Sequence, residues 1–134
     1  MRFGSAGVTA AALSTIVAAL AVPATAQAGP TADVVAGRER VKVTVHGVPV
    51  HPESCRVDPD ADGHTRSLPV EPSGSMVAHG VAPGPRRVLV WCPDGGIVHE
   101  QIVHVLPADP LADLADHVFR TAGSSDRVTD PTLR

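Results

Sequence analysis

Apolar and polar side chains alternate along three separate stretches of the chain. In residues 41 to 46 the valines occupy odd positions with polar residues between them, a period of two that is typical of a half-buried strand. Residues 55 to 58 repeat this pattern briefly, with Cys55 in phase with Val57. In residues 86 to 92 the side chains of Val88, Val90 and Cys92 share one face. The phases predict separate strands whose inward faces carry both cysteines.

Turn residues bound the remaining candidate strands. His64 to Val70 contains Pro69, which would confine a strand to the edge of a sheet or cut it short, and Met76 to His79 lies between two glycines. Pro93-Asp94-Gly95-Gly96 is typical of a hairpin turn. We therefore expect Ile97 to Leu106 to pair with Arg86 to Cys92.

Near the C-terminus the spacing of the apolar residues changes from every second position to that of a helix. Asp109 is suited to the N-cap of a helix and Pro110 to its first position. Apolar residues then recur at helical spacing: Leu111, Leu114, Ala115, Val118 and Phe119. We expect a short helix that caps one end of the sheets.

The first 28 residues have the layout of a secretory signal. After Arg2 no charged residue occurs before Asp33, residues 8 to 22 are apolar and rich in alanine, and Ala26-Gln27-Ala28 supplies a small-x-small cleavage pattern. The alternative is an uncleaved membrane anchor, but Pro23 interrupts the run short of the ~20 apolar residues that a span requires. We expect cleavage after Ala28, no stable membrane span afterwards, and a secreted, extracellular mature chain.

The expected export decides how the two cysteines are interpreted. An oxidising compartment favours a disulfide, and Cys55 and Cys92 allow only one pairing. The competing interpretation, a pair of metal-binding or redox thiols, requires close spacing such as C-x-x-C, which this chain lacks. We expect one disulfide between them.

These signals predict an all-β fold, a small Greek-key β-sandwich of about six to seven strands with one disulfide and a short C-terminal helix. Polar stretches without periodicity are expected to be flexible or disordered. The expected parts are a signal peptide at 1–28, a flexible N-terminal segment at 29–38, the β-sandwich domain at 39–108, the short helix at 109–120 and a disordered tail at 121–134.

One hairpin resembles a known class of secreted module. Gly80-Val81-Ala82-Pro83-Gly84 followed by Arg87 to Cys92 is similar to the G-h-x-P-G-x-h-x-V-x-V hairpin of transthyretin-like modules, including carboxypeptidase regulatory-like and related Ig-like domains, and Val43 to Val50 resembles their first strand. Pro85-Arg86-Arg87 stands where an aromatic residue usually follows the turn. The Cys…Trp…Cys order of true immunoglobulin domains is missing. The resemblance implies a structural or adhesive accessory module without catalysis, and it carries over no site residue.

Composition narrows the function classes. The formal net charge is -3, and Arg86 and Arg87 form the only compact basic pair, so nucleic-acid binding is not expected. Ser73-Gly74-Ser75 does not make the nucleophile elbow of a hydrolase. We expect no enzymatic activity and no cofactor.

Seven histidines are the main candidates for chemistry. Histidines that converge in the fold would bind Zn²⁺ or Cu²⁺. His99 and His104 resemble the H-E-x-x-H zinc motif, but three residues separate Glu100 from His104, and on a strand the two histidines lie on opposite faces. The candidate ligands are His46, His51, His79, His99 and His104, with His64 as a further possibility. The alternative is that all are solvated.

A second candidate metal site is the acidic loop Asp58-Pro59-Asp60-Ala61-Asp62-Gly63. It matches the opening D-x-D-x-D-G of a calcium loop through Asp58, Asp60 and Asp62. Pro69 occupies the twelfth position, where a calcium loop has a glutamate. The alternative is an acidic hairpin turn in which Asp and Gly serve the backbone conformation.

Three functions remain open. The first is an exported non-catalytic β-sandwich that binds an unknown protein, glycan or envelope surface. The second is a histidine-based metal-binding protein or small hydrolase. The third is a secreted protease inhibitor, although such inhibitors carry a second disulfide for which this chain has no cysteines.

Overall fold

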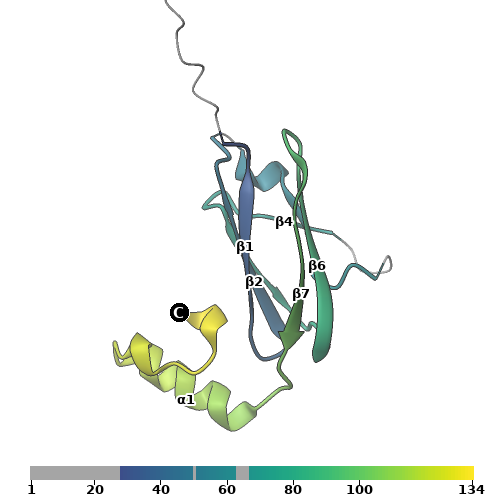
Figure 1. Ribbon diagram of the computed structural model, residues 1–134. Coiled ribbons are helices and arrows are strands. Elements are labelled where there is room, and N and C mark those ends of the chain that lie inside the picture. Colours follow the sequence, from purple (N-terminus) through teal and green to yellow (C-terminus); the bar gives the residue numbers. More distant parts are fainter. Residues whose placement is uncertain (1–27, 50, 63–66) are drawn as a thin grey trace, which may run out of the picture.

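Two antiparallel sheets face each other in the computed structural model, which describes residues 28–49, 51–62 and 67–134 (Figure 1). The first sheet has the order β1-β2-β5 and the second has the order β4-β3-β6-β7. The strands are β1 (Thr31–Ala36), β2 (Arg40–His46), β3 (Arg56–Asp58), β4 (Leu68–Pro69), β5 (Ser75–His79), β6 (Gly84–Cys92) and β7 (Gly96–Val105). The predicted all-β Greek-key sandwich with one disulfide and a short C-terminal helix is confirmed.

The chain changes sheets three times. Hairpins join β1 to β2, β3 to β4 and β6 to β7, whereas the connections after β2, β4 and β5 cross from one sheet to the other. The end of the first sheet also meets the end of β7, where the N–H of Glu39 donates to Leu106 O and the N–H of Leu106 donates to Gly37 O, both at 2.9 Å. These bonds close one side of the sandwich next to the start of the C-terminal helix.

The core is aliphatic, as the alternation predicted. The odd-numbered valines of β2 are buried, and so are Val57 on β3 and Val88 and Val90 on β6. The other buried apolar residues of the sandwich are Ala32, Val70, Met76, Ala78, Val81, Val103 and Val105. Small β-branched side chains fill a sheet interface without large rings, which suits a thin sandwich.

The disulfide between Cys55 and Cys92 lies in this core, and neither residue is more than 1% exposed. Arg56 pairs with Trp91 in the register of β3 and β6, so the two cysteines stand opposite each other on neighbouring strands. The bond therefore lies within the four-stranded sheet and closes a loop of 37 positions. As predicted, both sulfurs point inward and Trp91 points outward, with 41% of its surface exposed.

The β6–β7 hairpin has the predicted pairing and turn. The register shifts at Val90 and Trp91, because Val90 pairs with His99 whereas Trp91 pairs with Ile97. Val98 is therefore the extra residue of a bulge. The bulge precedes His99, so His99 and His104 remain on opposite faces of the strand as predicted.

The expectation that residues 29–38 are flexible is wrong. Thr31–Ala36 forms β1, which pairs along its whole length with β2. β1 is an edge strand whose side chains are only partly covered, so its sequence lacks a clean alternation.

The expectation that residues 121–134 form a disordered tail is also wrong. Two short 3-10 helices, Ser125–Arg127 and Pro131–Leu133, follow the main helix, and Val128, Asp130 and Thr132 are buried. Buried polar contacts, described below, fix this segment against the rest of the fold, and no apolar stripe is needed for that. Hydropathy patterns do not detect such contacts.

The predicted signal peptide lies outside the described residues except for Ala28, and His64 also lies outside them. Among the residues that the structure describes, no helix is long and apolar enough to cross a membrane.

Candidate functional site

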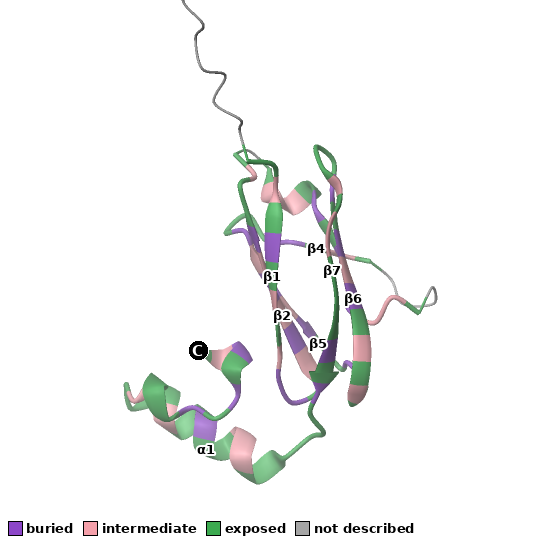
Figure 2. Cartoon of the chain, viewed as in Figure 1, coloured by how far each residue is buried: buried purple, intermediate pink, exposed green. Residues whose placement is uncertain are grey.

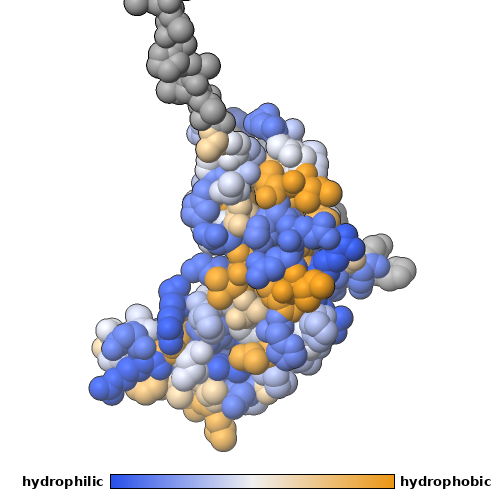
Figure 3. All heavy atoms as spheres, in the orientation of Figure 1, coloured by the Kyte–Doolittle hydropathy of each residue, from blue (hydrophilic) through white to orange (hydrophobic). Residues whose placement is uncertain are grey.

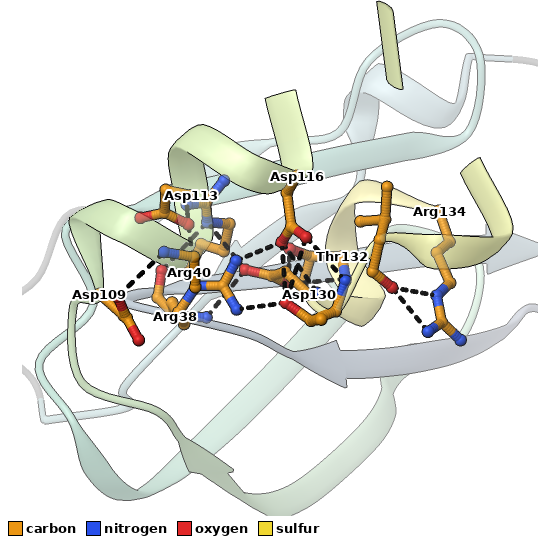
Figure 4. A network of polar contacts seen from close by, with 11 residues as sticks. Arg38, Arg40, Asp109, Asp113, Asp116, Asp130, Thr132 and Arg134 are labelled. Atoms are coloured by element: carbon orange, nitrogen blue, oxygen red, sulfur yellow. Dashed lines mark hydrogen bonds and ion pairs between the residues drawn. The ribbon is translucent and has the colours of Figure 1, made fainter. Parts of the chain in front are cut away.

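Helix α1 (Pro110–Thr121) lies at the end of the sandwich where β7 ends, and the C-terminal segment turns back from it toward β1 and β2 (Figure 1). The helix begins as predicted: Pro110 is at its first position, and the Asp109 side chain accepts a hydrogen bond of 3.0 Å from the N–H of Ala112. Its position next to the sheets depends on a network of charged groups (Figure 4).

Arg38, in the turn between β1 and β2, is the centre of this network. Only 7% of its surface is exposed. Its Nε donates to Asp113 Oδ1 at 2.8 Å, its Nη1 donates to Thr129 Oγ1 at 3.0 Å, and its Nη2 forms an ion pair with Asp116. One guanidinium therefore joins the sandwich, α1 and the C-terminal segment.

Asp116 is fully buried on α1. Burial by itself would raise the pKa of its carboxyl, but the N–H of Thr129 at 2.8 Å, the Arg38 guanidinium and the N–H of Asp130 at 3.1 Å all donate to it. These donors stabilise the ionised form and lower the pKa of Asp116 from 3.8 to about 2. The surroundings of Asp116 therefore favour an ionised carboxylate at this position.

Asp130 is the second fully buried carboxylate. Burial favours its neutral form, but hydrogen bonds from Thr132 and from the N–H of Arg38, together with the charge of Arg40, lower its pKa. Asp130 lies directly against Gly37, where the β-carbon of any other residue would overlap its carboxylate. The glycine thus lets the C-terminal segment approach the β1–β2 turn.

This network reverses the usual orientation of an amphipathic helix. At about 100° per residue, Asp113 and Asp116 lie on one side of α1, and Leu111, Leu114 and Val118 form a stripe about 60° wide on the opposite side. The stripe is exposed: the exposed fractions are 80% for Leu111, 61% for Leu114 and 53% for Val118. The prediction of a short helix at the end of the sheets was correct, but the side that faces the sandwich is the acidic one.

The figures show the same arrangement. In Figure 2, α1 is exposed or half-buried except at one buried segment, the position of Asp116. In Figure 3 a hydrophobic group lies at the lower tip of the molecule, over the start of α1.

We call Leu111, Leu114 and Val118 the apolar face of α1. Apolar side chains exposed as one contiguous stripe mark an interaction surface more often than scattered ones do.

A pocket of about 520 Å³ lies at the opposite end of the sandwich, beside the disulfide. Its walls are mostly apolar and include Pro30, Val48, Pro49 and Pro93, with His51, Ser54 and Asp94 as polar groups. Among the described residues that line it, the titratable side chains are His51 and Asp94.

The candidate metal ligands are dispersed over the described part of the chain. His46 lies at the end of β2 with Nε2 2.9 Å from Asp33 Oδ2, and His51 contacts Glu53 at 2.9 Å. His79 pairs with Arg40 at the other end of the same sheet. His99 contacts Gln101, and His104 is exposed on β7. Within the described residues no group of three or more His, Cys, Asp or Glu side chains could hold a metal ion.

The acidic loop after β3 has a local structural role. Asp58 Oδ1 accepts a hydrogen bond of 2.9 Å from the N–H of Ala61, and Ala61 adopts a positive φ of 44°. Asp58 thus caps a tight turn. Asp60 and Asp62 lie in the same turn and each makes a further interaction.

Sequence reasoning missed the residues that position α1: Arg38, Asp116 and Asp130. Asp116 lies on the polar side of an amphipathic helix and Asp130 lies in a polar stretch, so hydropathy alone gives no sign that either side chain is buried. The one available signal was the spacing of Asp113 and Asp116, which places both opposite the apolar stripe. Comparison of the chain with family models, curated proteins and solved structures found no match.

Proposed function

We propose that this chain is an exported, non-catalytic β-sandwich protein that binds a protein partner through the apolar face of α1. The observation that carries the proposal is the orientation of the helix, which exposes Leu111, Leu114 and Val118 and buries Asp116. Such an arrangement lowers solubility unless the face has a partner. It also uses two buried carboxylates to hold the face in place.

The chemistry of the face favours a protein over a glycan or an anionic envelope surface. It is aliphatic, whereas sugars are bound mainly by aromatic rings and directed hydrogen bonds. Amphipathic helices that bind anionic lipid carry many Lys and Arg residues on their polar side, whereas Arg120 is the only Lys or Arg in α1 and its polar side carries Asp113 and Asp116. Apolar protein side chains complement it best.

Export is part of the proposal. The disulfide is compatible with an oxidising compartment, and the N-terminal sequence has the layout of a cleaved signal. Mass spectrometry of the protein recovered from culture medium should give a chain that begins at Gly29 and has both cysteines oxidised. Recovery only from within cells, with residues 1–28 attached, would disprove export.

Site-specific photo-crosslinking in cells that naturally produce the protein tests the binding function. A benzophenone amino acid in place of Leu111 should give a discrete adduct. The same amino acid in place of Ile102 is the matched control, because Ile102 is 69% exposed but lies on β7. Adducts at both positions, or at neither, would disprove docking through α1.

A further inference from the structure

Two glycines accept the segment that leads into β1, at the end of the sandwich where the β6–β7 turn lies (Figure 1). A β-carbon on Gly47 would lie only 3.2 Å from the carbonyl oxygen of Gly29. A β-carbon on Gly95 would lie 2.8 Å from Cγ of Pro30. Glycine at both positions therefore lets this segment lie against the loop after β2 and against the β6–β7 turn.

The same contact places Gly29 beside a carboxylate. Among the described residues that line the disulfide-end pocket, Asp94 is the only one with a carboxyl group, and Gly29 lines that pocket too. Gly29 directly precedes Pro30, as Asp94 directly precedes Gly95. Consecutive Cα atoms are about 3.8 Å apart, so the contact between Pro30 and Gly95 brings the residues that precede them into one small region.

The polar groups of this pocket are mainly hydrogen-bond acceptors. An ionised Asp94 can only accept. His51 Nδ1 lies 2.9 Å from Glu53 Oε1, and because an ionised carboxylate only accepts, Nδ1 carries the ring proton. In the neutral ring Nε2 is then an acceptor as well. The described residues of the wall include no lysine or arginine. The pocket therefore complements a donor that carries positive charge.

We infer that this donor is the amino terminus of the mature chain, which docks against Asp94 once the signal peptide has been removed. Cleavage after Ala28 converts the backbone nitrogen of Gly29 from an uncharged amide with one donor into an ammonium group with three. This inference rests on the cleavage that forms part of the proposed function, and it is independent of docking through α1.

Docking of the amino terminus stabilises the start of β1. The first residues of a domain fray unless they are held in place, and β1 is an edge strand that pairs only with β2 in its sheet. An ion pair between Gly29 and Asp94 links the entry to β1 with the β6–β7 turn of the other sheet. Removal of the signal peptide thus adds a link between the two sheets that the uncleaved chain does not have.

Carbodiimide cross-linking of the mature chain tests the contact. The reagent joins an amine directly to a carboxylate in contact with it, with loss of one water molecule. The mature chain has only two amines, on Gly29 and Lys42. Peptide mass mapping should find an amide between Gly29 and Asp94. No cross-link at Gly29, or one from Gly29 to another carboxylate, would overturn the inference.

Two variants and one modification test the role of the charges. Asp94→Ser should abolish the cross-link, whereas Asp126→Ser, at an exposed position near α1, should leave it in place. Acetylation of the amino group of Gly29 should lower the melting temperature of the wild-type chain by about 2 °C, as expected for an exposed ion pair. It should leave the melting temperature of Asp94→Ser unchanged. Equal shifts in the two chains would overturn the inference.

The first residue of the secreted chain separates this inference from the proposed function. A chain that begins at Gly29 but gives no cross-link to Asp94 overturns this inference and leaves export and docking through α1 intact. A secreted chain that begins at another residue also overturns it, without affecting docking through α1. Recovery only of the uncleaved chain from within cells overturns both export and this inference.

Discussion

Single residues decide which side of α1 faces the sandwich. Burying one side of the helix could have placed its leucines against the sheets, yet the structure places Asp116 there, with donors from Arg38, Thr129 and Asp130 around it. A buried carboxylate is tolerated only when it is ionised, paired and fully hydrogen-bonded. The identity of these few polar side chains, and not hydropathy, sets the orientation.

Asp116→Asn should therefore lower the free energy of unfolding much more than the same substitution at an exposed aspartate does. The substitution keeps the size of the side chain but leaves the buried Arg38 guanidinium without its closest negative charge. Loss of one partner of a buried pair costs about 3 kcal/mol. Urea denaturation checks the effect, with the exposed Asp126→Asn as control. Equal unfolding free energies for the two variants would show that the Arg38–Asp116 pair contributes nothing.

At the scale of elements, alternation predicted the strands and their inward faces because each strand of the core buries one side. β2, β3 and β6 were predicted in this way, and the hairpin turn located β7. β1 was missed because an edge strand covered on part of one side needs no alternation. The C-terminal segment was missed because its long-range contacts are polar, and the residue at the other end of each contact is not visible from a local pattern.

Acid should release the C-terminal segment before the sandwich unfolds. The pKa of Asp116 is lowered from 3.8 to about 2 in the folded state, so its contribution to stability is present above about pH 4 and is lost as the pH falls through about 2. The pKa of Asp130 is also lowered, so protonation of Asp130 in acid destabilises the folded state in the same direction. Amide hydrogen exchange should show lost protection at residues 128–134 on going from pH 6 to pH 2.5. The amides of β2 should stay protected after correction for intrinsic exchange rates. Simultaneous loss in both regions would contradict separate docking of the segment.

At the scale of the whole molecule, a thin aliphatic core is reinforced by one covalent bond. The two sheets are filled by valine, alanine and methionine, so each buried side chain contributes less apolar area than a ring would. The disulfide compensates by restricting the unfolded chain. Both the disulfide and the sandwich were predictable from the sequence, because each cysteine falls on the same side of its strand as the buried valines.

Removal of the disulfide should destabilise the sandwich strongly. For a closed loop of 37 positions, the chain-entropy model gives about 4 kcal/mol. The double variant Cys55→Ser with Cys92→Ser should show this loss in urea denaturation, and the wild-type chain unfolded with a reductant should match it. A loss below about 1 kcal/mol would mean that the bond does not constrain the unfolded state.

The packing of α1 with its acidic side inward is the feature on which docking through the apolar face depends, and the ionisation of Asp116 tests it most directly. Carbon-13 NMR of the side-chain carboxyl, followed as a function of pH, gives its pKa residue by residue. We predict a pKa of about 2 for Asp116. An ordinary value near 4 would mean that this carboxylate lies in water and that the helix does not pack on its acidic side.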